Sequence, residues 1–392
     1  MIIKQFKVTR LNQNKDWCFD LSFHEDINIL TGKNGSGKTT LLKLIWYLIS
    51  GHIERIIPNT SEENALFENI EIETDTFSLS IRDNRTSETN RMSKTDKNRQ
   101  KNGKCLFVEW DIGNGKQTRN LSITEYGKFD PFLSREILKV SKSSIFFPTF
   151  RRMEGGFFTL PQETKAKSFE EAYLTMQPER VYRELEVGLN NLSKVFSVGQ
   201  HQFMTSLSTE DIVNYIARQY ADISEKTNQF QKELAEFITE RTVQASSDKK
   251  RDEALFEIQN KVNEVTQKTD HILQPFTILS KWVAELFQYS GIKLTEHLTL
   301  GEATNALSSE KLSSGEKQML SFLCYNAFYD NGIIFIDEPE LSLHVDWQRM
   351  LFDILMEQGT QNQLIVATHS PFIYSQFPDK ELILDDDKGG EI

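Results

Sequence analysis

A glycine-rich run near the start of the chain has the residue types of a phosphate-binding loop. The run is Gly32-Lys33-Asn34-Gly35-Ser36-Gly37-Lys38-Thr39, which fits the pattern G-x4-G-K-[ST]. Its glycines allow backbone N–H groups to turn inward around phosphate oxygens, and Lys38 can reach the β- and γ-phosphates as a point charge. The Thr39 hydroxyl can ligate Mg²⁺, and the helix predicted over 39–49 adds the positive end of its dipole. The run therefore predicts a site for a nucleoside triphosphate with Mg²⁺.

Two adjacent acids follow a short apolar run late in the chain. Residues 333–336 are four consecutive apolar residues, which suits a parallel strand buried on both faces, and Asp337 and Glu338 come next. Acids at the C-terminal end of such a strand lie where open α/β sheets bind ligands. Asp337 is therefore placed to hold Mg²⁺, and Glu338 is placed to polarise the attacking water. The pattern is a weak indication alone and a strong one beside the phosphate loop.

A third motif, Leu312-Ser313-Ser314-Gly315-Glu316-Lys317-Gln318, precedes that strand. Ser313 and Ser314 are typical helix caps, Gly315 permits a close approach, and a helix is predicted over 317–326. A helix start of this kind is a second anion site, with an ordinary capped helix as the alternative.

His369 ends a strand predicted over 364–368. At that position its ring could touch a γ-phosphate. A histidine at a strand end is usually structural, but beside the other motifs we interpret His369 as a catalytic or sensor residue.

The elements that must position these motifs form an α/β core with a helical region inserted. Between about 165 and 290 helix formers dominate, and a break at 246–250 predicts two antiparallel helices of about 25–35 residues, reaching about 40–50 Å. We predict a nucleotide-binding core in two parts, 1–160 and 305–392, around a helical insertion over 161–304. The expected strands and helices of the core are the strands 2–11, 18–30, several over 66–126, 145–150, 333–336, 364–368 and 381–384, and the helices 39–49 and 347–357.

The amino-acid composition limits the classes of protein to which this chain can belong. The chain has 392 residues, 38% of them hydrophobic, which allows two or three domains with a sizeable core and excludes wholesale disorder. Its net charge of −12 argues against a surface coated with phosphate-binding charge. The cysteines, Cys18, Cys105 and Cys324, lack metal spacing and predict buried thiols in a reducing compartment. The absence of a long apolar run and of a signal-peptide pattern favours a cytoplasmic protein without a membrane partner.

One segment departs from this acidic background. Residues 82–104 contain eight Lys/Arg and three acids. The segment is either a solvent-exposed hairpin loop, which we favour, or a contact to nucleic acid or an acidic partner.

The order of these motifs, phosphate loop, LSSGEKQ, DEPELSLH and then ATHSP, resembles that of the ABC-type ATPase heads of the RecF, SMC and OLD group. The resemblance covers about 1–60 and 305–385. It implies an α/β P-loop NTPase fold, an ABC-type head with an inserted helical hairpin, which converts ATP and water to ADP and phosphate with Mg²⁺. In such heads the signature of one subunit contacts the nucleotide of another, which implies a homodimer or higher homo-oligomer with composite ATP sites.

The resemblance also assigns roles to residues. Residues 313–318 become the signature and 340–344 the D-loop, and His369 becomes the switch histidine. The sequence departs from the family at the Q-loop, where no glutamine is clear. Phe147-Pro148-Thr149-Phe150-Arg151-Arg152 occupies that place, with Arg151 or Arg152 as a source of charge and Gln162 as a weaker candidate. The predicted site residues are Glu338, His369 and Lys38 for catalysis, Thr39 and Asp337 for the metal, and Gly32, Asn34, Gly35, Ser36, Gly37, Lys38, Thr39, Thr40, Ser313, Ser314, Gly315 and Glu316 for the nucleotide.

The compact insertion and the segment FPTFRRMEGG resemble the stand-alone ATPases of PARIS-type and Septu-like anti-phage systems. This resemblance implies a subunit whose ATP state holds or releases a separate effector, a nuclease or toxin. The alternative is a DNA-repair or chromosome-associated ATPase that clamps DNA. A transporter ATPase is disfavoured by the long insertion. About 20 residues follow His369, and their acids, Asp385 to Asp387, predict a solvated tail rather than a nuclease cluster.

Overall fold

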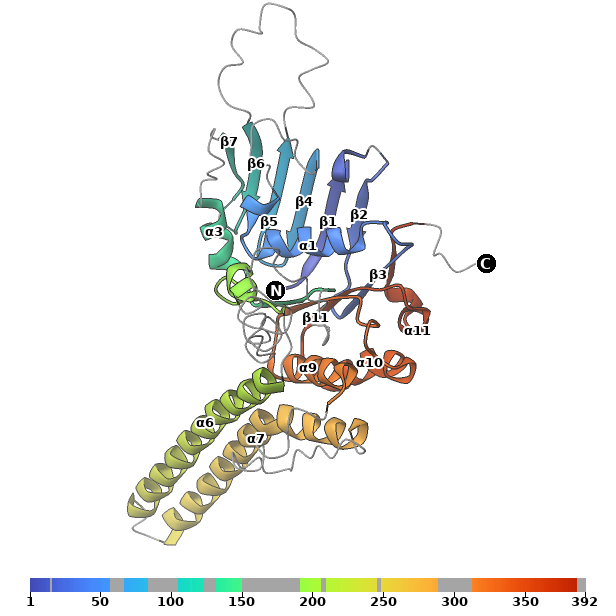
Figure 1. The fold of residues 1–392 in the computed structure, drawn as a ribbon. Helices are drawn as coiled ribbons and strands as arrows, with labels where there is room; N and C mark the ends of the chain where they lie inside the picture. The colour runs from blue at the N-terminus through green and yellow to red at the C-terminus, as the bar shows by residue number, and fades with distance from the viewer. Residues whose placement is uncertain are drawn as a thin grey trace, which may run out of the picture. The chain divides into compact units, whose positions relative to one another are not determined.

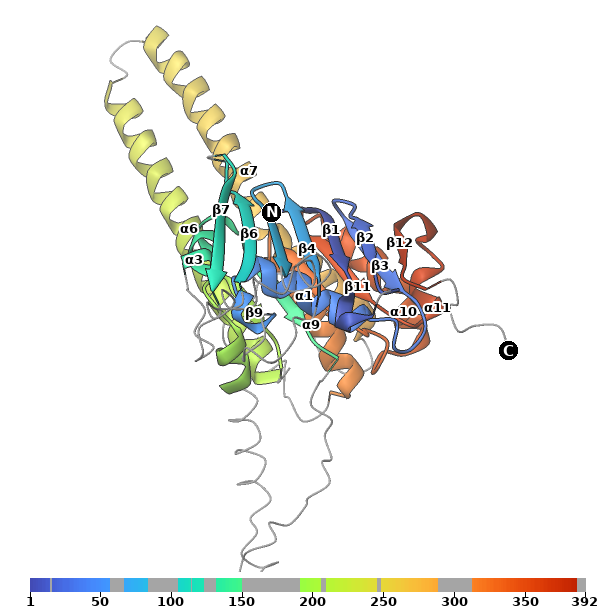
Figure 2. The same ribbon diagram turned by 90° about the horizontal axis from the view of Figure 1, so that it is seen from above.

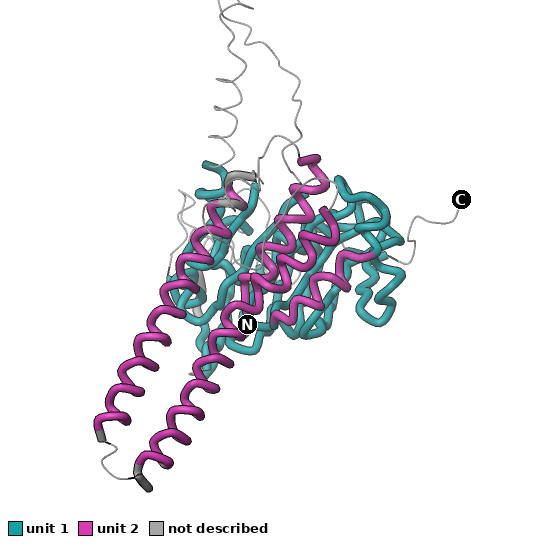
Figure 3. The backbone as a smooth tube through the Cα atoms, turned by 90° about the horizontal axis from the view of Figure 1, so that it is seen from below, with its two compact units in different colours: residues 1–206, 331–349, 361–392 teal, residues 207–330, 350–360 magenta. Residues whose placement is uncertain are grey.

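The computed structural model describes residues 1–14, 16–56, 67–83, 105–113, 115–122, 132–149, 191–205, 209–244, 248–287 and 312–385. The chain divides into two compact units (Figure 3). Unit 1 comprises residues 1–206, 331–349 and 361–392, and unit 2 comprises residues 207–330 and 350–360. The helix that follows Ser313 belongs to unit 2, together with the inserted hairpin.

A parallel sheet of six strands forms the base of the candidate site in unit 1. Its order is β12-β3-β11-β10-β8-β9, and its three central strands β3, β11 and β10 are buried along their whole length, as their continuous apolar sequences predict. The register pairs Ile336 with both Val366 and Phe147, and Ala367 with Leu30, so these strands end at the same edge. The strand bounds are β3 (Ile27–Thr31), β8 (Ser144–Phe147), β9 (His201–Phe203), β10 (Ile333–Asp337), β11 (Gln363–Ala367) and β12 (Glu381–Ile383).

A second sheet in unit 1 is antiparallel, with the order β2-β1-β4-β5-β6-β7. Its strands alternate between buried and exposed residues, and the predicted inward row Leu106, Val108 and Trp110 is buried. The strand bounds are β1 (Ile3–Thr9), β2 (Phe19–Ser22), β4 (Asn69–Thr74), β5 (Ser78–Asp83), β6 (Cys105–Asp111) and β7 (Gln117–Ser122).

Helix α1 (Lys38–Ile49) joins the two sheets into one hydrophobic core. The core contains buried side chains of α1, of the antiparallel strands and of β10 and β11. Figure 1 shows α1 running across the antiparallel strands, and Figure 2 shows the same arrangement from above. A helix that is apolar nearly all round is typical of this packing between layers. Unit 1 also contains α3 (Phe132–Val140), α11 (Pro371–Tyr374), a helical segment over 191–196 and the short 3-10 turns Leu11–Gln13, Ile53–Arg55 and Pro378–Lys380.

One predicted strand is wrong in its extent. The strand expected over 18–30 is two strands, β2 and β3, which belong to different sheets. The polar residues between them form the crossing, where the Asn28 amide oxygen accepts a hydrogen bond from the His24 backbone N–H at 2.7 Å and Asp26 pairs with Lys380 at 2.7 Å.

Unit 2 consists of the hairpin α6 (Thr209–Gln244) and α7 (Asp248–Leu286), helix α9 (Ser314–Phe328) and the C-terminal part of α10 (Val345–Glu357). The two hairpin helices have 36 and 39 residues, more than the 25–35 expected, so they reach about 54 and 58 Å. Helix α7 continues past Pro275 because the next turns are anchored by packing: the Phe276 ring lies 4.6 Å from that of Phe328. Figure 1 shows α7 bending partway along, as a proline inside a helix requires.

The structure also bears on the predictions about the cysteines and about membrane-spanning helices. Cys324 is buried as predicted, whereas Cys18 is exposed because it lies just before the edge strand β2, and the side chain of Cys105 lies outside the described residues. None of the described helices has a stretch long and apolar enough to cross a bilayer.

Candidate nucleotide-binding site

The glycine-rich run forms a tight loop between β3 and α1. Gly32, Gly35 and Gly37 all have positive φ angles, of 145°, 86° and 94°. At Gly32 a Cβ atom would lie 2.8 Å from the Ser36 Oγ, so a larger residue would have to displace Ser36 and adopt a strained backbone conformation. Gly37 lies at the N-cap of α1, which places the helix N-terminus at the loop.

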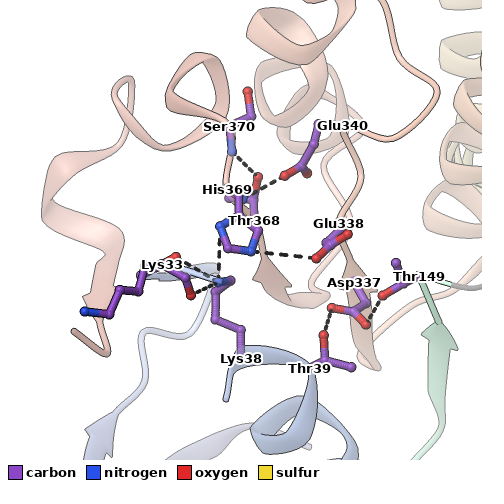
Figure 4. A network of polar contacts seen from close by, with 11 residues as sticks. Lys33, Lys38, Thr39, Thr149, Asp337, Glu338, Glu340, Thr368, His369 and Ser370 are labelled. Carbon is purple, nitrogen blue, oxygen red and sulfur yellow. Dashed lines mark hydrogen bonds and ion pairs between the residues drawn. The ribbon is translucent and has the colours of Figure 1, made fainter. Parts of the chain in front are cut away.

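Lys38 points back across this loop (Figure 4). Its Nζ donates to the carbonyl oxygens of Gly32 at 2.8 Å and Lys33 at 3.1 Å, and lies 3.3 Å from Nδ1 of His369. Burial lowers the pKa of Lys38, while the nearby carboxylates of Glu338, Glu340 and Asp337 act in the opposite direction. The ammonium is therefore held at the mouth of the loop by contacts from two separate segments.

Asp337 ends β10 and is completely buried. Its Oδ1 accepts a hydrogen bond from the Thr39 Oγ1 at 2.9 Å, and its Oδ2 accepts one from the Thr149 Oγ1. The structure thus brings together the two predicted metal ligands, Thr39 and Asp337, and adds Thr149, which we did not predict as a site residue. A signal for Thr149 was present, since it follows the apolar end of a strand in the parallel sheet.

Glu338 and His369 face each other beyond Asp337. The backbone N–H of Glu338 donates to the Ala367 carbonyl at 2.8 Å, and its φ of 48° is a left-handed conformation that non-glycine residues adopt mainly at functional or strained positions. Its Oε1 lies 3.8 Å from the His369 Nε2. Burial, and then the charge of Lys38, lower the pKa of His369, so the ring is neutral near pH 7. Because Lys38 donates toward Nδ1, the ring proton belongs on Nε2, facing Glu338.

Glu340 holds the loop that carries His369. Its Oε1 accepts a hydrogen bond from the His369 backbone N–H at 2.7 Å, while its Oε2 is buried and without a hydrogen-bond partner among the described residues. The Ser370 hydroxyl then donates to the Gln348 Oε1 at 2.6 Å. From the sequence, Glu340 is expected only as part of the D-loop motif, and its contact with the His369 backbone emerges from the structure.

The signature residues lie in unit 2, at the start of α9. Ser313 is the N-cap: its Oγ accepts from the Glu316 backbone N–H at 3.3 Å, and the Glu316 carboxylate accepts from the Ser313 backbone N–H at 2.8 Å. Ser314 is the first helical residue rather than a cap, and Gly315 is buried. The motif is a capping box, the predicted helix start.

A cavity of about 450 Å³ adjoins the phosphate loop on the side of β12. Its lining includes Trp17, Cys18, Leu384 and Ser36, and the Ser36 Oγ is buried without a hydrogen-bond partner among the described residues. Asp385 also lines it and pairs with Lys33 at 3.3 Å, so this residue of the run expected to be a solvated tail contacts the phosphate loop, while Asp386 and Asp387 lie outside the described residues. This contact follows from β12, whose pairing with β3 brings Asp385 to the loop.

These residues fit a triphosphate with Mg²⁺. An unpartnered Ser36 hydroxyl, a loop whose three glycines have positive φ angles and a buried lysine are features of a phosphate site. Thr39 and Asp337 are the protein groups that would hold Mg²⁺, an ion that is bound by few protein ligands plus phosphates. Of the other predicted residues, Asn34 is exposed on the loop and Thr40 is half-buried on α1, while Arg151, Arg152 and Gln162 lie outside the described residues.

A family model and two curated relatives match parts of this chain. A family model described as an AAA ATPase domain matches residues 1–374. Over 76 residues the chain is 42% identical to the DNA replication and repair protein RecF of Glaesserella parasuis serovar 5 (strain SH0165), which is 18% of this chain and 21% of the relative. Over 75 residues it is 36% identical to Endonuclease GajA of Bacillus cereus (strain VD045), 18% of this chain and 13% of the relative. The chain thus spans about a fifth or less of these relatives.

Among solved structures, the Smc head domain with an extended coiled coil bound to the C-terminal domain of ScpA, from Pyrococcus furiosus, aligns over 95% of this chain and 91% of its own, with 12% identity and a TM-score of 0.37. A second Smc head, bound to the C-winged helix domain of ScpA, gives a TM-score of 0.38 at 11% identity, over 96% of this chain and 91% of its own. The family model spans nearly the whole chain, and the predicted α/β P-loop fold and the ABC-type motif order of the RecF, SMC and OLD group are confirmed. The chain belongs to the AAA ATPase domain family and is an ATPase.

Proposed function

We propose that this ATPase is the switch subunit of a cytoplasmic anti-phage defence complex, and that its ATP state determines whether a separately encoded effector, a nuclease or toxin, is held or released. The observation that carries the proposal is the contact of Lys38, Glu338 and His369, through which three segments meet at one point (Figure 4). The match to Endonuclease GajA supports the defence setting.

The proposed chemistry uses residues already in contact. Lys38 neutralises charge on the β- and γ-phosphates, and the unpartnered Ser36 hydroxyl adds a donor. Thr39 and Asp337 would hold Mg²⁺, which would supply positive charge to the phosphoryl group in transfer. Trp17 and Leu384, in the adjoining cavity, offer an apolar wall for the adenine ring.

Glu338 is the proposed general base. Its carboxylate accepts a proton from the attacking water, and the neutral His369 ring lies on the same side, with its Nε2 3.8 Å from the Glu338 Oε1, where it would sense the γ-phosphate. Glu340, through the His369 backbone, holds the ring in place.

The second half of each ATP site is proposed to come from a neighbouring copy. Ser313, Ser314, Gly315 and Glu316 form a helix start with the dipole of an anion site, and a two-fold contact would place it against the nucleotide of the partner. Mixing a Lys38→Ala chain with a Ser313→Arg chain tests this arrangement. The mixed dimer keeps one intact composite site, so ATPase activity should return on mixing. Hydrolysis by a monomer, at a specific rate independent of protein concentration, would contradict it.

The existence of a separate effector is tested by looking for a partner encoded by a neighbouring gene. We expect a TOPRIM-like or HNH gene beside this one, whose product co-purifies with the Glu338→Gln chain in ATP and with the wild-type chain to a different extent after hydrolysis. Equal recovery in both nucleotide states would argue against the switch. The matched control is the Lys38→Ala chain, which is expected not to respond to ATP.

A DNA-clamping ATPase is the second candidate, favoured by the match to RecF and by the basic segment 82–104. Replacing Arg91, Lys94, Lys97 and Arg99 with Ser should weaken a salt-dependent interaction and leave basal ATP turnover unchanged. If binding to DNA and to the effector is unchanged across a salt titration, the segment is a loop without a binding role.

A further inference from the structure

Thr149 is tied to the carboxylate that we assign to the metal site. Both oxygens of Asp337 accept a hydrogen bond from a threonine hydroxyl, Oδ1 from Thr39 and Oδ2 from Thr149 (Figure 4). Asp337 is fully buried, so the direction of its carboxylate is set by these protein donors rather than by bulk water.

The sheet explains why Thr149 reaches that carboxylate. Strand β8 pairs in parallel with β10, with Phe147 opposite Ile336, and both strands are buried throughout. The buried Pro148 follows, and Thr149 then lies beyond the end of β8, level with the edge where β10 ends in Asp337. Thr39 approaches the same carboxylate from the first turn of α1, so the two hydroxyls come from separate elements.

We propose that Thr149 is a positioning residue for the metal site: its hydroxyl fixes the rotation of the Asp337 carboxylate, so that Asp337 and Thr39 are oriented for the Mg²⁺ of bound ATP. The inference rests on the nucleotide site proposed above. If Thr149 served only to give the buried carboxylate a hydrogen-bond donor, its loss would lower the stability of the fold. ATP affinity would then change equally with and without Mg²⁺.

The test is the Mg²⁺ dependence of ATP binding by Thr149→Val, measured with a fluorescent ATP analogue in excess Mg²⁺ and in EDTA. We expect the affinity in EDTA to match that of the wild type, and the affinity in Mg²⁺ to fall roughly tenfold, as for the loss of one hydrogen bond to a charged group. Thr149→Ser keeps the hydroxyl and should restore the Mg²⁺ effect. Thr118→Val, the same change on an exposed strand of the antiparallel sheet, is the matched control.

Each other outcome overturns the proposal. Equal losses of ATP affinity in Mg²⁺ and in EDTA would show that Thr149 has a structural role only. Unchanged ATP affinity in both conditions would show that Thr149 has no role at the site. If Thr149→Ser did not restore the Mg²⁺ effect, the Thr149 hydroxyl would be excluded as the cause of that effect. If circular dichroism shows that Thr149→Val does not fold, Thr149→Ala, which introduces no methyl group against the carboxylate, replaces it. Absence of Mg²⁺-dependent ATP binding in the wild type would instead contradict the nucleotide site itself.

Discussion

The phosphate-loop side and the signature side of the proposed ATP site are built in opposite ways. In unit 1, Lys38, Asp337 and His369 come from distant segments and are joined by contacts between segments. In unit 2, Ser313 and Glu316 are three positions apart and satisfy each other in a capping box. The first arrangement exists only once the parallel sheet has formed, whereas the second needs one helix start.

The two regions are therefore expected to respond differently to substitutions. A change in unit 1 alters a residue that touches partners across strands at the site, so it should act directly on ATP binding or on hydrolysis, according to the role of that residue. A change in the capping box alters one helix end and leaves the phosphate loop in its own unit unaffected.

The largest expected effect is that of Lys38→Ala on ATP binding. The change removes an ammonium that would make charge-assisted contacts to phosphate, so affinity should fall by roughly 100-fold to 10,000-fold. Nucleotide titration by fluorescence measures the loss. Lys43→Ala, on the same helix α1, is the matched control and should bind ATP as the wild type does. Normal binding by Lys38→Ala would remove the phosphate loop from the site.

Glu338→Gln should separate binding from hydrolysis within unit 1. The amide cannot accept the proton of the attacking water, so turnover should fall roughly 100-fold or more while ATP affinity is retained. Single-turnover hydrolysis and retention of radiolabelled ATP measure the two quantities. Loss of binding equal to that of Lys38→Ala would contradict the separate roles of the two residues.

As the pH falls, unit 1 should lose stability at a higher pH than unit 2 does. Burial lowers the pKa of His201 and of His52 to about 4, and His201 bonds to Ser144 at 2.8 Å and to Ser141 at 3.0 Å. Since the folded pKa lies below the unfolded value near 6.5, the stabilisation is complete above pH 6.5 and is lost as pH falls toward 4, about 3 kcal/mol for His201.

Hydrogen exchange at pH 7 and pH 5 checks this order. After correction for the slower intrinsic exchange at the lower pH, the protection factors of peptides from β8 and β9 should be smaller at pH 5 than at pH 7, while those of peptides from α9 should be unchanged. In unit 2 burial raises the pKa of Cys324 and Tyr325, so these groups lose their stabilising effect at alkaline pH instead. His201→Gln, which keeps polar contacts without titrating, should reduce the acid effect, and an unchanged acid effect would exclude His201 as its source.

The smallest expected effect is that of Ser313→Ala. Loss of the N-cap should cost about 1 kcal/mol of the stability of α9, because the Glu316 backbone N–H loses its acceptor. Thermal unfolding measures the change, and Ser313→Asn, an equally good cap, is the control. ATP binding by the dilute monomer should be unaffected, and a parallel loss of binding would link the two regions within one chain.

The local motifs were predictable because their chemistry is local. The octapeptide turn that starts at Gly32, helix α1, the apolar strand that ends in Asp337 and the Ser313 cap each depend on neighbours in sequence, and each was predicted near its observed bounds. The crossing between β2 and β3 was missed because a short polar interruption does not show whether the chain turns within one sheet or passes to another.

What the sequence by itself determined is the set of local elements and the kinds of side chain available for phosphate, metal and water. Only the tertiary structure decided which of those side chains meet: Thr149 with Asp337, Glu340 with the His369 backbone, and Asp385 with Lys33. The physical reason is the register of the parallel sheet. Parallel pairing aligns the ends of strands that are far apart in the chain, and no local periodicity encodes that alignment.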